Sequence, residues 1–406
     1  MEGYLRKEKR NILFISNGHA EDTIAARIIE ELLKLSSLLN IKALPLVSEG
    51  KSYAHLKIRV LGPRRMMPSG GFVGFNPLWL ARDMASGWLG VLRGQVGALR
   101  KQRAVTRLVV CVGDVFLVIL SVLFLKKPII FLCTAKSAYA RLLKDHYRIE
   151  KWLMKRFCQL VLPRDELTTS SLQNFGINAV YVGNVMMDCL KITGEDFGIG
   201  ENKYIVGILP GSKEEAYKNL PIILDVVKKI SRKSFLSRKV DFLLSLAASL
   251  SLERLGEVVS LSRDWILESS ASEERKRGIV ACFVSAPGIR IKIVRGRFAD
   301  VLNTSEVIIG LSGMGNEQAV GLGKPVVSFP TKGPQITKRF LHIQQLILGE
   351  AISIVEPKAE TVAEEVAVIL SHPEKREEVL RVGKKRMGGP GAAAQVADLI
   401  KKELGE

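Results

Sequence analysis

The stretch 310–330 reads GLSGMGNEQAVGLGKPVVSFP, and it follows directly on an apolar run. That run, 307–311, predicts a buried strand, because short continuous apolar segments suit strands covered on both faces. Glycines then interrupt the pattern, residues 315–321 have the character of a helix, and a second apolar run at 325–329 predicts another strand. The stretch therefore predicts a strand, a tight turn, a helix and a second strand.

The turn within this stretch offers groups that can bind a ligand. Gly313 and Gly315 let the backbone turn sharply and keep side chains away, so free N–H groups at the helix start can face a phosphate. Glu317 follows one turn later, where its carboxylate can accept hydrogen bonds from a vicinal diol such as a ribose. An ordinary strand-to-helix turn also fits, because an acid is favourable in the first turn of any helix. The spacing alone leaves both interpretations open.

A resemblance to a known family favours the binding role. The segment from Ser312 to Pro325 resembles the donor-binding signature of glycosyltransferases with the GT-B architecture. Together with the sequence LPGSK at 209–213, it is similar to lipid-A-disaccharide synthase and to proteins related to that enzyme. The similarity covers nearly the whole chain.

The resemblance implies an α/β protein with the GT-B fold, in which two Rossmann-like domains with parallel sheets face each other. We expect an acceptor-side domain over 1–192, a glycine-rich polar linker at 193–203, and a nucleotide-sugar-binding domain over 204–390. The last segment, 391–406, should be a helix that returns to pack on the first domain.

The resemblance also implies a set of donor-binding residues in the second domain. The loop at 209–213 would offer backbone, hydroxyl and ammonium groups to a diphosphate. Its lysine stands where the related synthase usually has arginine. The glutamine of the set would meet the sugar hydroxyls or the diphosphate, although a polar helix start explains it equally well. The expected donor residues are Gly211, Ser212, Lys213, Ser312, Gly313, Gly315, Glu317 and Gln335.

Two candidate catalytic residues follow strands of the first domain. His19 comes after the apolar run 11–16, and Asp114 comes after 108–113, so both should lie at the carboxyl edge of the sheet. His19 resembles the histidine of the lipid-linked N-acetylglucosamine transferase of peptidoglycan synthesis, and Asp114 resembles an aspartate of lipid-A-disaccharide synthase. That synthase has a different sequence at the first loop, and only Asp22 matches an acid there. A loop histidine and a helix N-cap are the purely structural alternatives.

Basic and aromatic residues are concentrated between 62 and 110. Asn76 followed by proline predicts a helix start there. Such a helix suits a membrane interface, with aromatic rings among the headgroups and arginines on lipid phosphates. A core helix with solvated arginines remains an equal alternative, and nucleic acid ranks below both because no nucleic-acid-binding motif is present. The expected acceptor and membrane residues are Arg82, Arg93, Arg100, Trp79 and Trp88.

Composition limits the class of protein. The 406 residues carry a formal net charge of +19, which suggests phosphate-bearing partners. Five scattered cysteines indicate free thiols in a reducing compartment, and the basic N-terminus lacks the apolar region of a signal peptide. The apolar stretch 108–125 approaches the length of a membrane span, but Gly113 and Asp114 interrupt it, which favours a strand followed by a helix. We therefore expect a cytoplasmic protein, peripheral at the inner face of the membrane.

These features together predict an inverting glycosyltransferase. It would move a sugar from a nucleotide donor, UDP-linked as in UDP-GlcNAc, to a lipid or lipid-linked acceptor. No metal site and no cofactor is expected, because such a transfer requires only a base and donors for the leaving diphosphate. Asp114 is slightly favoured as the base, with His19 orienting the acceptor or contacting the donor phosphates. A UDP-sugar epimerase of the same fold and a non-enzymatic scaffold at the membrane are the alternatives.

Overall fold

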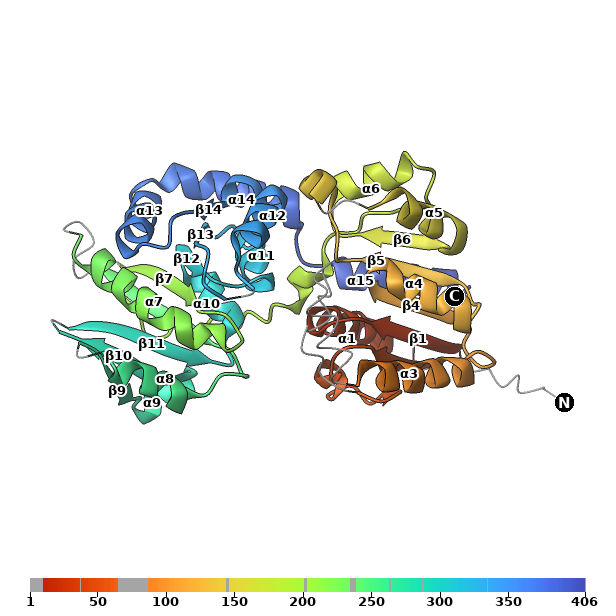
Figure 1. Cartoon of the computed structure of the whole chain (residues 1–406), viewed down its shortest axis with the longest axis horizontal. Helices are drawn as coiled ribbons and strands as arrows, with labels where there is room; N and C mark the ends of the chain where they lie inside the picture. The colour runs from red at the N-terminus through yellow and green to blue at the C-terminus, as the bar shows by residue number, and fades with distance from the viewer. Residues whose placement is uncertain are drawn as a thin grey trace. The chain divides into compact units, whose positions relative to one another are not determined.

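The structure is a computed structural model that divides into two compact units, each described here by itself (Figure 1). The first unit comprises the described residues of Met1–Cys189 and Gly389–Glu406, and the second comprises those of Leu190–Gly388. The residues that the structure describes are 10–36, 38–64, 87–143, 146–200, 203–233, 239–262, 264–286, 288–333 and 335–405.

The described part of the first unit contains a six-stranded parallel sheet in the order β3-β2-β1-β4-β5-β6. This is the strand order of dinucleotide-binding Rossmann folds. The strands expected at 11–16 and 108–113 are confirmed. The bounds are β1 Arg10–Ser16, β2 Leu39–Pro45, β3 Arg59–Val60, β4 Leu108–Gly113, β5 Ile129–Cys133 and β6 Leu160–Pro163.

Helices cover both faces of this sheet. Successive side chains of a strand point to opposite faces. Val109 and Phe131 therefore pack in one cluster with Leu117 of α4 and Met154 of α5. Leu132 lies on the opposite face, together with α1 and α15. The helices are α1 His19–Leu35, α3 Trp88–Gln102, α4 Val115–Phe124, α5 Arg148–Phe157, α6 Glu166–Gln173 and α15 Ala392–Glu403, with short 3-10 turns η1 Lys51–Tyr53, η2 Ala138–Leu143 and η3 Val185–Cys189.

The C-terminal helix α15 packs against α1, as the resemblance implied. Its N-terminus is held by Asp188, whose carboxylate accepts hydrogen bonds from the backbone N–H groups of Gly391 and Ala393. A carboxylate at this position also complements the positive end of the helix dipole. Val396 and Ile400 are fully buried. Asp188, from the middle of the chain, thus anchors the C-terminal helix α15.

The described part of the second unit contains an eight-stranded sheet in the order β14-β13-β12-β7-β8-β11-β10-β9. Its core is parallel, whereas β10 pairs antiparallel with both β11 and β9 at one edge. The sequence did not predict this edge. The strands are β7 Tyr204–Leu209, β8 Val240–Leu246, β9 Ile266–Ser269, β10 Ile279–Ser285, β11 Ile289–Arg295, β12 Val307–Gly310, β13 Val326–Ser328 and β14 Ile352–Ile354.

Helices follow most of these strands, which gives the alternation typical of a Rossmann-like unit. The helix predicted after the glycine-rich turn is confirmed as α11. The charged segment 269–278 contains the short helix α9. The helices are α7 Glu215–Ser231, α8 Leu252–Ser260, α9 Ser272–Lys276, α10 Phe298–Thr304, α11 Met314–Gly321, α12 Lys338–Leu348, α13 Ala359–Ser371 and α14 Pro373–Met387, with the 3-10 turn η4 Gly349–Ala351.

The apolar stretch 108–125 is a strand followed by a helix, as predicted. Among the described residues, no helix is long and apolar enough to cross a membrane. The helix start expected at Asn76 lies outside the described residues.

Candidate functional site

In the second unit, the expected donor residues gather at the carboxyl ends of three neighbouring strands. These strands, β7, β12 and β13, are adjacent in the sheet, and ligands of open α/β sheets bind at this edge. Gly211 follows β7 with φ +109°, a conformation that favours glycine. A Cβ added there would stand 3.2 Å from the carbonyl oxygen of Leu311, so the loops after β7 and β12 approach closely.

The glycine-rich turn after β12 is closed by the side chain of one of its own residues. The Ser312 hydroxyl accepts a hydrogen bond from the backbone N–H of Gly315 at 3.2 Å. Gly313 is the residue at the N-cap position of α11, and Glu317 lies half-buried in the first turn of this helix. The structure thus brings four of the predicted residues onto one turn and the helix that it opens.

Two buried amides support this turn, and the sequence did not predict them. Gln344 of α12 donates to the carbonyl oxygen of Gly313 at 2.9 Å and accepts from the Asn316 amide at 2.9 Å. Asn316 also donates to the carbonyl oxygen of Gly310 at 3.1 Å. Both side chains are almost fully buried. The amide N–H groups of both side chains are paired with backbone or side-chain oxygens, so this network helps to fix the path of the turn.

The third loop of this edge follows β13 and is tied to the start of α7. The backbone N–H of Gln335 donates to the Glu215 carboxylate at 2.9 Å. Ser212 and Lys213 are exposed in the loop before α7, and the Ser212 carbonyl accepts from Ser249 at 2.6 Å. The Ser212 hydroxyl and the Lys213 ammonium group are therefore exposed to solvent beside the glycine-rich turn.

In the first unit, both candidate catalytic residues lie at the carboxyl ends of adjacent strands, β1 and β4. His19 is exposed at the first position of α1. Asp114 is the N-cap of α4 and accepts from the Phe116 backbone N–H at 2.9 Å. The Asn17 side chain also hydrogen-bonds to Asp114, which joins the two loops. Gly113 permits this contact, because a Cβ there would stand 1.9 Å from the Asn17 amide oxygen.

Burial raises the pKa of Asp114 above its ordinary value. The hydrogen bonds from Phe116 and Asn17 oppose this shift, and the Glu150 carboxylate adds to it. Glu150 itself forms an ion pair with Lys136 at 2.7 Å. Desolvation of this kind is how a carboxylate becomes a better proton acceptor.

A buried polar network stands directly behind the His19 loop. Asp22 is fully buried and accepts hydrogen bonds from Ser16 at 2.6 Å and from Ser48. The Ser16 hydroxyl also meets the Tyr53 hydroxyl at 2.7 Å. Burial raises the pKa of Asp22, and the two serine hydroxyls oppose that rise. Asp22, the acid that matches the related synthase, is therefore enclosed by its hydrogen-bond partners and is not exposed.

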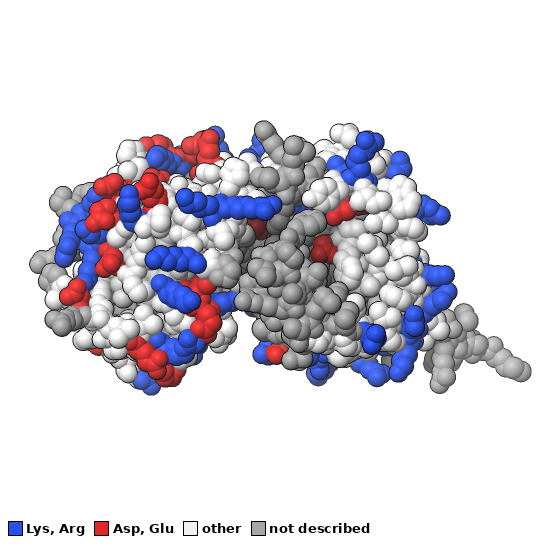
Figure 2. Space-filling model, viewed as in Figure 1, with Lys and Arg blue, Asp and Glu red and all other residues white. Residues whose placement is uncertain are grey.

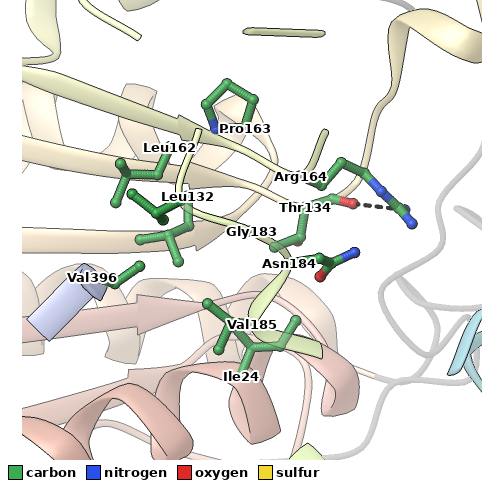
Figure 3. A pocket seen from close by; sticks show the side chains of 11 residues that line it. Ile24, Leu132, Thr134, Leu162, Pro163, Arg164, Gly183, Asn184, Val185 and Val396 are labelled. Atoms are coloured by element: carbon green, nitrogen blue, oxygen red, sulfur yellow. Dashed lines mark hydrogen bonds between the residues drawn. The ribbon is translucent and has the colours of Figure 1, made fainter. Parts of the chain in front are cut away.

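A small cavity of about 20 Å³ lies beyond β5 and β6, room for about one water (Figure 3). Its wall is mostly apolar, but Thr134, Arg164 and Asn184 border it from one side (Figure 3). The Arg164 guanidinium donates to the Thr134 carbonyl at 3.3 Å. Asn184 is therefore a residue that lines this cavity at the carboxyl edge of the first unit's sheet.

The residues expected at a membrane are only partly within the described chain. Arg93 and Arg100 are exposed on α3, and the Arg100 guanidinium lies 5.3 Å from the centre of the Phe124 ring. Arg82 and Trp79 lie outside the described residues, as does the side chain of Trp88. The helix is fixed by Gln95, which is buried and donates to the Leu46 carbonyl at 2.7 Å.

Within the described residues, no group of three or more histidine, cysteine or acidic side chains could hold a metal ion. No disulfide forms among the five cysteines, all of which are described and free. Burial raises the pKa of the Cys111 thiol to about 12, so this thiol is not reactive.

Comparison with known proteins shows a distant relationship and the fold. No protein-family profile matches the chain. Lipid-A-disaccharide synthase of Geobacter sulfurreducens is 24% identical over 253 residues, which are 57% of this chain and 59% of that enzyme. The enzyme of Trichlorobacter lovleyi is 23% identical over 55% of this chain and 57% of its own length. The chain is thus a distant homologue of lipid-A-disaccharide synthase, and the matches span less than two thirds of these relatives.

Solved structures identify the fold. MnaA of S. aureus, solved with UDP, matches with a TM-score of 0.59 at 13% identity, over 98% of this chain and 97% of that one. UDP-GlcNAc 2-epimerase of Neisseria meningitidis, solved with UDP-GlcNAc, matches with a TM-score of 0.58 at 14% identity, over 98% of this chain and 100% of that one. MurG of Acinetobacter baumannii matches with a TM-score of 0.59 at 13% identity, over 97% of this chain and 99% of that one. The chain has the GT-B fold, like these structures.

Proposed function

We propose that the protein is a glycosyltransferase that moves a sugar from a UDP-linked donor to a lipid or lipid-linked acceptor at the inner face of the membrane. The observation that carries the proposal is the edge formed by β7, β12 and β13. There a glycine-rich turn, a helix start and an exposed lysine lie together, which suits a nucleotide diphosphate. The distant homology to lipid-A-disaccharide synthase supports transfer rather than another reaction.

The reaction needs a base and a means of stabilising the leaving group. The acceptor hydroxyl oxygen would attack the anomeric carbon while the bond from that carbon to the UDP oxygen breaks. The electron pair of that bond goes to the diphosphate, and the hydroxyl proton goes to Asp114. N–H groups of the glycine-rich turn, Ser212 and Lys213 would meet the diphosphate. His19 would orient the acceptor or contact the donor phosphates.

The test is an assay of UDP release from a panel of UDP-sugars, with and without a lipid extract. A transferase releases UDP only when an acceptor is present, and the sugar appears in the lipid fraction. UDP release without lipid, or no release from any sugar, contradicts the proposal.

The donor site is tested by Glu317→Gln. A hydrogen bond from a ribose hydroxyl to a charged acceptor contributes roughly 1.5–3 kcal/mol, so the affinity for UDP should fall by about 10-fold or more. Glu364→Gln, on a helix of the same unit that follows β14 rather than the glycine-rich turn, is the matched control. Wild-type affinity in Glu317→Gln would remove this residue from the site.

A UDP-sugar epimerase is the second candidate, because structures of that activity match nearly the whole chain. An epimerase changes the sugar while UDP stays attached or is eliminated without an acceptor. Analysis of the sugar products in the same assay separates the two activities.

A further inference from the structure

The outer face of α4 is apolar although it is exposed. Phe116, Ile119 and Leu123 recur at helical spacing on this face, and Leu123 is 59% exposed. The sequence of α4 is VFLVILSVLF, whose single polar residue, Ser121, is buried. A helix that is apolar all round is normally covered on every side. Something outside the described chain is therefore expected to cover this face.

The neighbouring helix α5 extends the same surface. It packs beside α4 on one face of the sheet, and its outward side chains include Ile149 and Trp152, which are 61% and 50% exposed. Trp152 packs edge-on against Phe157 at 6.0 Å between ring centres. Figure 2 shows mostly uncharged residues over this part of the first unit, with lysine and arginine side chains along its upper, right and lower edges. We call the exposed apolar residues of the two helices the α4–α5 face: Phe116, Ile119, Leu123, Ile149 and Trp152.

Cations surround this face. At the ends of α3 and α4, the side chains of Arg100, Arg103, Lys126 and Lys127 line a hollow of about 440 Å³. Cations near a helix C-terminus complement its dipole, which accounts for some of them. The helix dipole does not account for the wider excess of positive charge. The sequence 87–158 contains fourteen lysines and arginines but only three acids. One of those acids, Glu150, is already paired with Lys136.

We propose that the α4–α5 face docks on the surface of an anionic phospholipid bilayer. The apolar side chains would enter the headgroup region, and the surrounding cations would meet lipid phosphates. A second copy of the chain fits less well, because two such faces would bring their cations together. The inference deepens the proposed function, since a lipid-linked acceptor requires contact with a membrane, and it assigns that contact to helices other than the aromatic stretch expected from sequence.

The experiment measures sedimentation of the full-length protein with vesicles. Wild-type protein should bind vesicles that contain phosphatidylglycerol, less so as salt rises, and bind vesicles of phosphatidylcholine alone weakly. The triple variant Leu123→Gln, Ile149→Gln, Trp152→Gln should bind at least ~10-fold more weakly, because each apolar side chain adds about tenfold or more when buried. The double variant Lys126→Gln, Lys127→Gln should lose about 30-fold, which corresponds to about 1 kcal/mol per lysine.

Matched controls lie in the second unit. Leu261 is 86% exposed, and Lys384 and Lys385 are an adjacent exposed pair. Leu261→Gln and the double variant Lys384→Gln, Lys385→Gln should bind vesicles like the wild type. Circular dichroism and UDP affinity should be unchanged in every variant, since the substituted residues are exposed or, for Lys127, half-buried, and lie far in sequence from the donor loops.

Three results would overturn the proposal. They are absence of binding to phosphatidylglycerol vesicles, binding by the triple variant equal to that of Leu261→Gln, and a dimer that the triple variant abolishes without any vesicle binding. The proposed function fails separately, through absence of UDP binding or of sugar transfer. Vesicle binding without UDP binding would keep the docking face and reject the transferase.

Discussion

Asp114 combines two roles that can be separated by one substitution. As the N-cap of α4 its side chain accepts from the Phe116 backbone N–H, and as a desolvated carboxylate it has a raised pKa. Asparagine caps helices about as well as aspartate but cannot accept a proton as a base. Asp114→Asn therefore removes the proposed chemistry and keeps the helix start.

We expect Asp114→Asn to lower the turnover number by at least ~100-fold, the scale of general-base catalysis. The UDP affinity and the free energy of unfolding should change little. In the wild type, turnover should fall as the pH drops through the raised pKa of Asp114, because the base must be ionised; the variant's residual activity should lack this limb. Steady-state kinetics over a pH series measures both effects.

His19→Ala decides between the two candidate bases. If Asp114→Asn keeps its turnover while His19→Ala loses it, the assignment is reversed. If both variants keep their turnover, the base is another residue.

Asp22 should make stability depend on pH. Burial raises its pKa in the folded state above the ordinary value of 3.8. The folded state therefore binds the proton more tightly than the unfolded state, and the stability contributed by the protonated form is lost as pH rises through the raised pKa. Asp22→Asn cannot ionise and should lack this loss.

Urea unfolding of wild type and Asp22→Asn at pH 4 and at pH 7 tests this expectation. The free energy of unfolding of the variant minus that of the wild type should be larger at pH 7 than at pH 4. Glu273→Gln, at an exposed position on α9, is the control and should show no such difference. An equal effect of Asp22→Asn at both pH values would contradict the assignment of a raised pKa.

At the scale of elements, the glycine-rich turn depends on a helix that begins 20 residues or more after it. Gln344 of α12 is the residue that bonds both to the Gly313 carbonyl and to the Asn316 amide. We expect Gln344→Met, which keeps the length but removes the polar groups, to leave each of these partners one hydrogen bond short. The free energy of unfolding should fall by about 1–3 kcal/mol.

The same variant should weaken UDP binding, because the turn loses its support. Isothermal titration measures the affinity, and Gln345→Met, the next residue of α12 and an exposed one, is the matched control. Loss of stability with unchanged UDP affinity would show that the network supports the fold but not the binding turn.

These elements also show what the sequence could predict. The strand, turn and helix around Gly313 follow from local patterns of apolar residues and glycines, which is why β12, α11 and β13 were predicted. Gln344 was not, because its partner Asn316 lies 28 residues away and a lone glutamine in an amphipathic helix carries no local signal. The edge strand β9 was also missed, since it is short and its side chains are only half-buried or exposed.

The candidate site was predicted unevenly for the same reason. Glycines, His19 and Asp114 stand directly after strands, so their position at the carboxyl edge followed from the sequence. The environment of a side chain did not follow, because it depends on tertiary contacts. Asp22 matched an acid of the related synthase but is enclosed by Ser16 and Ser48.

At the scale of the whole molecule, the chain crosses between its two units at two places, near 190 and near 389. The linker expected at 193–203 has contacts within the second unit: the Thr193 and Gly194 backbone N–H groups donate to Asp300, and Phe197 is buried. Lys191 and Ile192, just before it, are exposed. The linker bounds therefore stay a prediction, and the exposed pair is the better place to test the division.

We expect a specific protease site inserted between Lys191 and Ile192 to be cut without dissociating the native protein. After cleavage, α15 belongs to the C-terminal fragment, yet it packs on α1 of the N-terminal fragment and is capped there by Asp188. Val396 and Ile400 are fully buried, and each such side chain contributes roughly 1.5–3 kcal/mol. The cut chains should co-elute in gel filtration and separate in denaturant. Val396→Asp in the cut protein should separate them without denaturant, because it buries an unpaired charge against α1. Co-elution of that variant would mean that contacts other than those of α15 hold the fragments together.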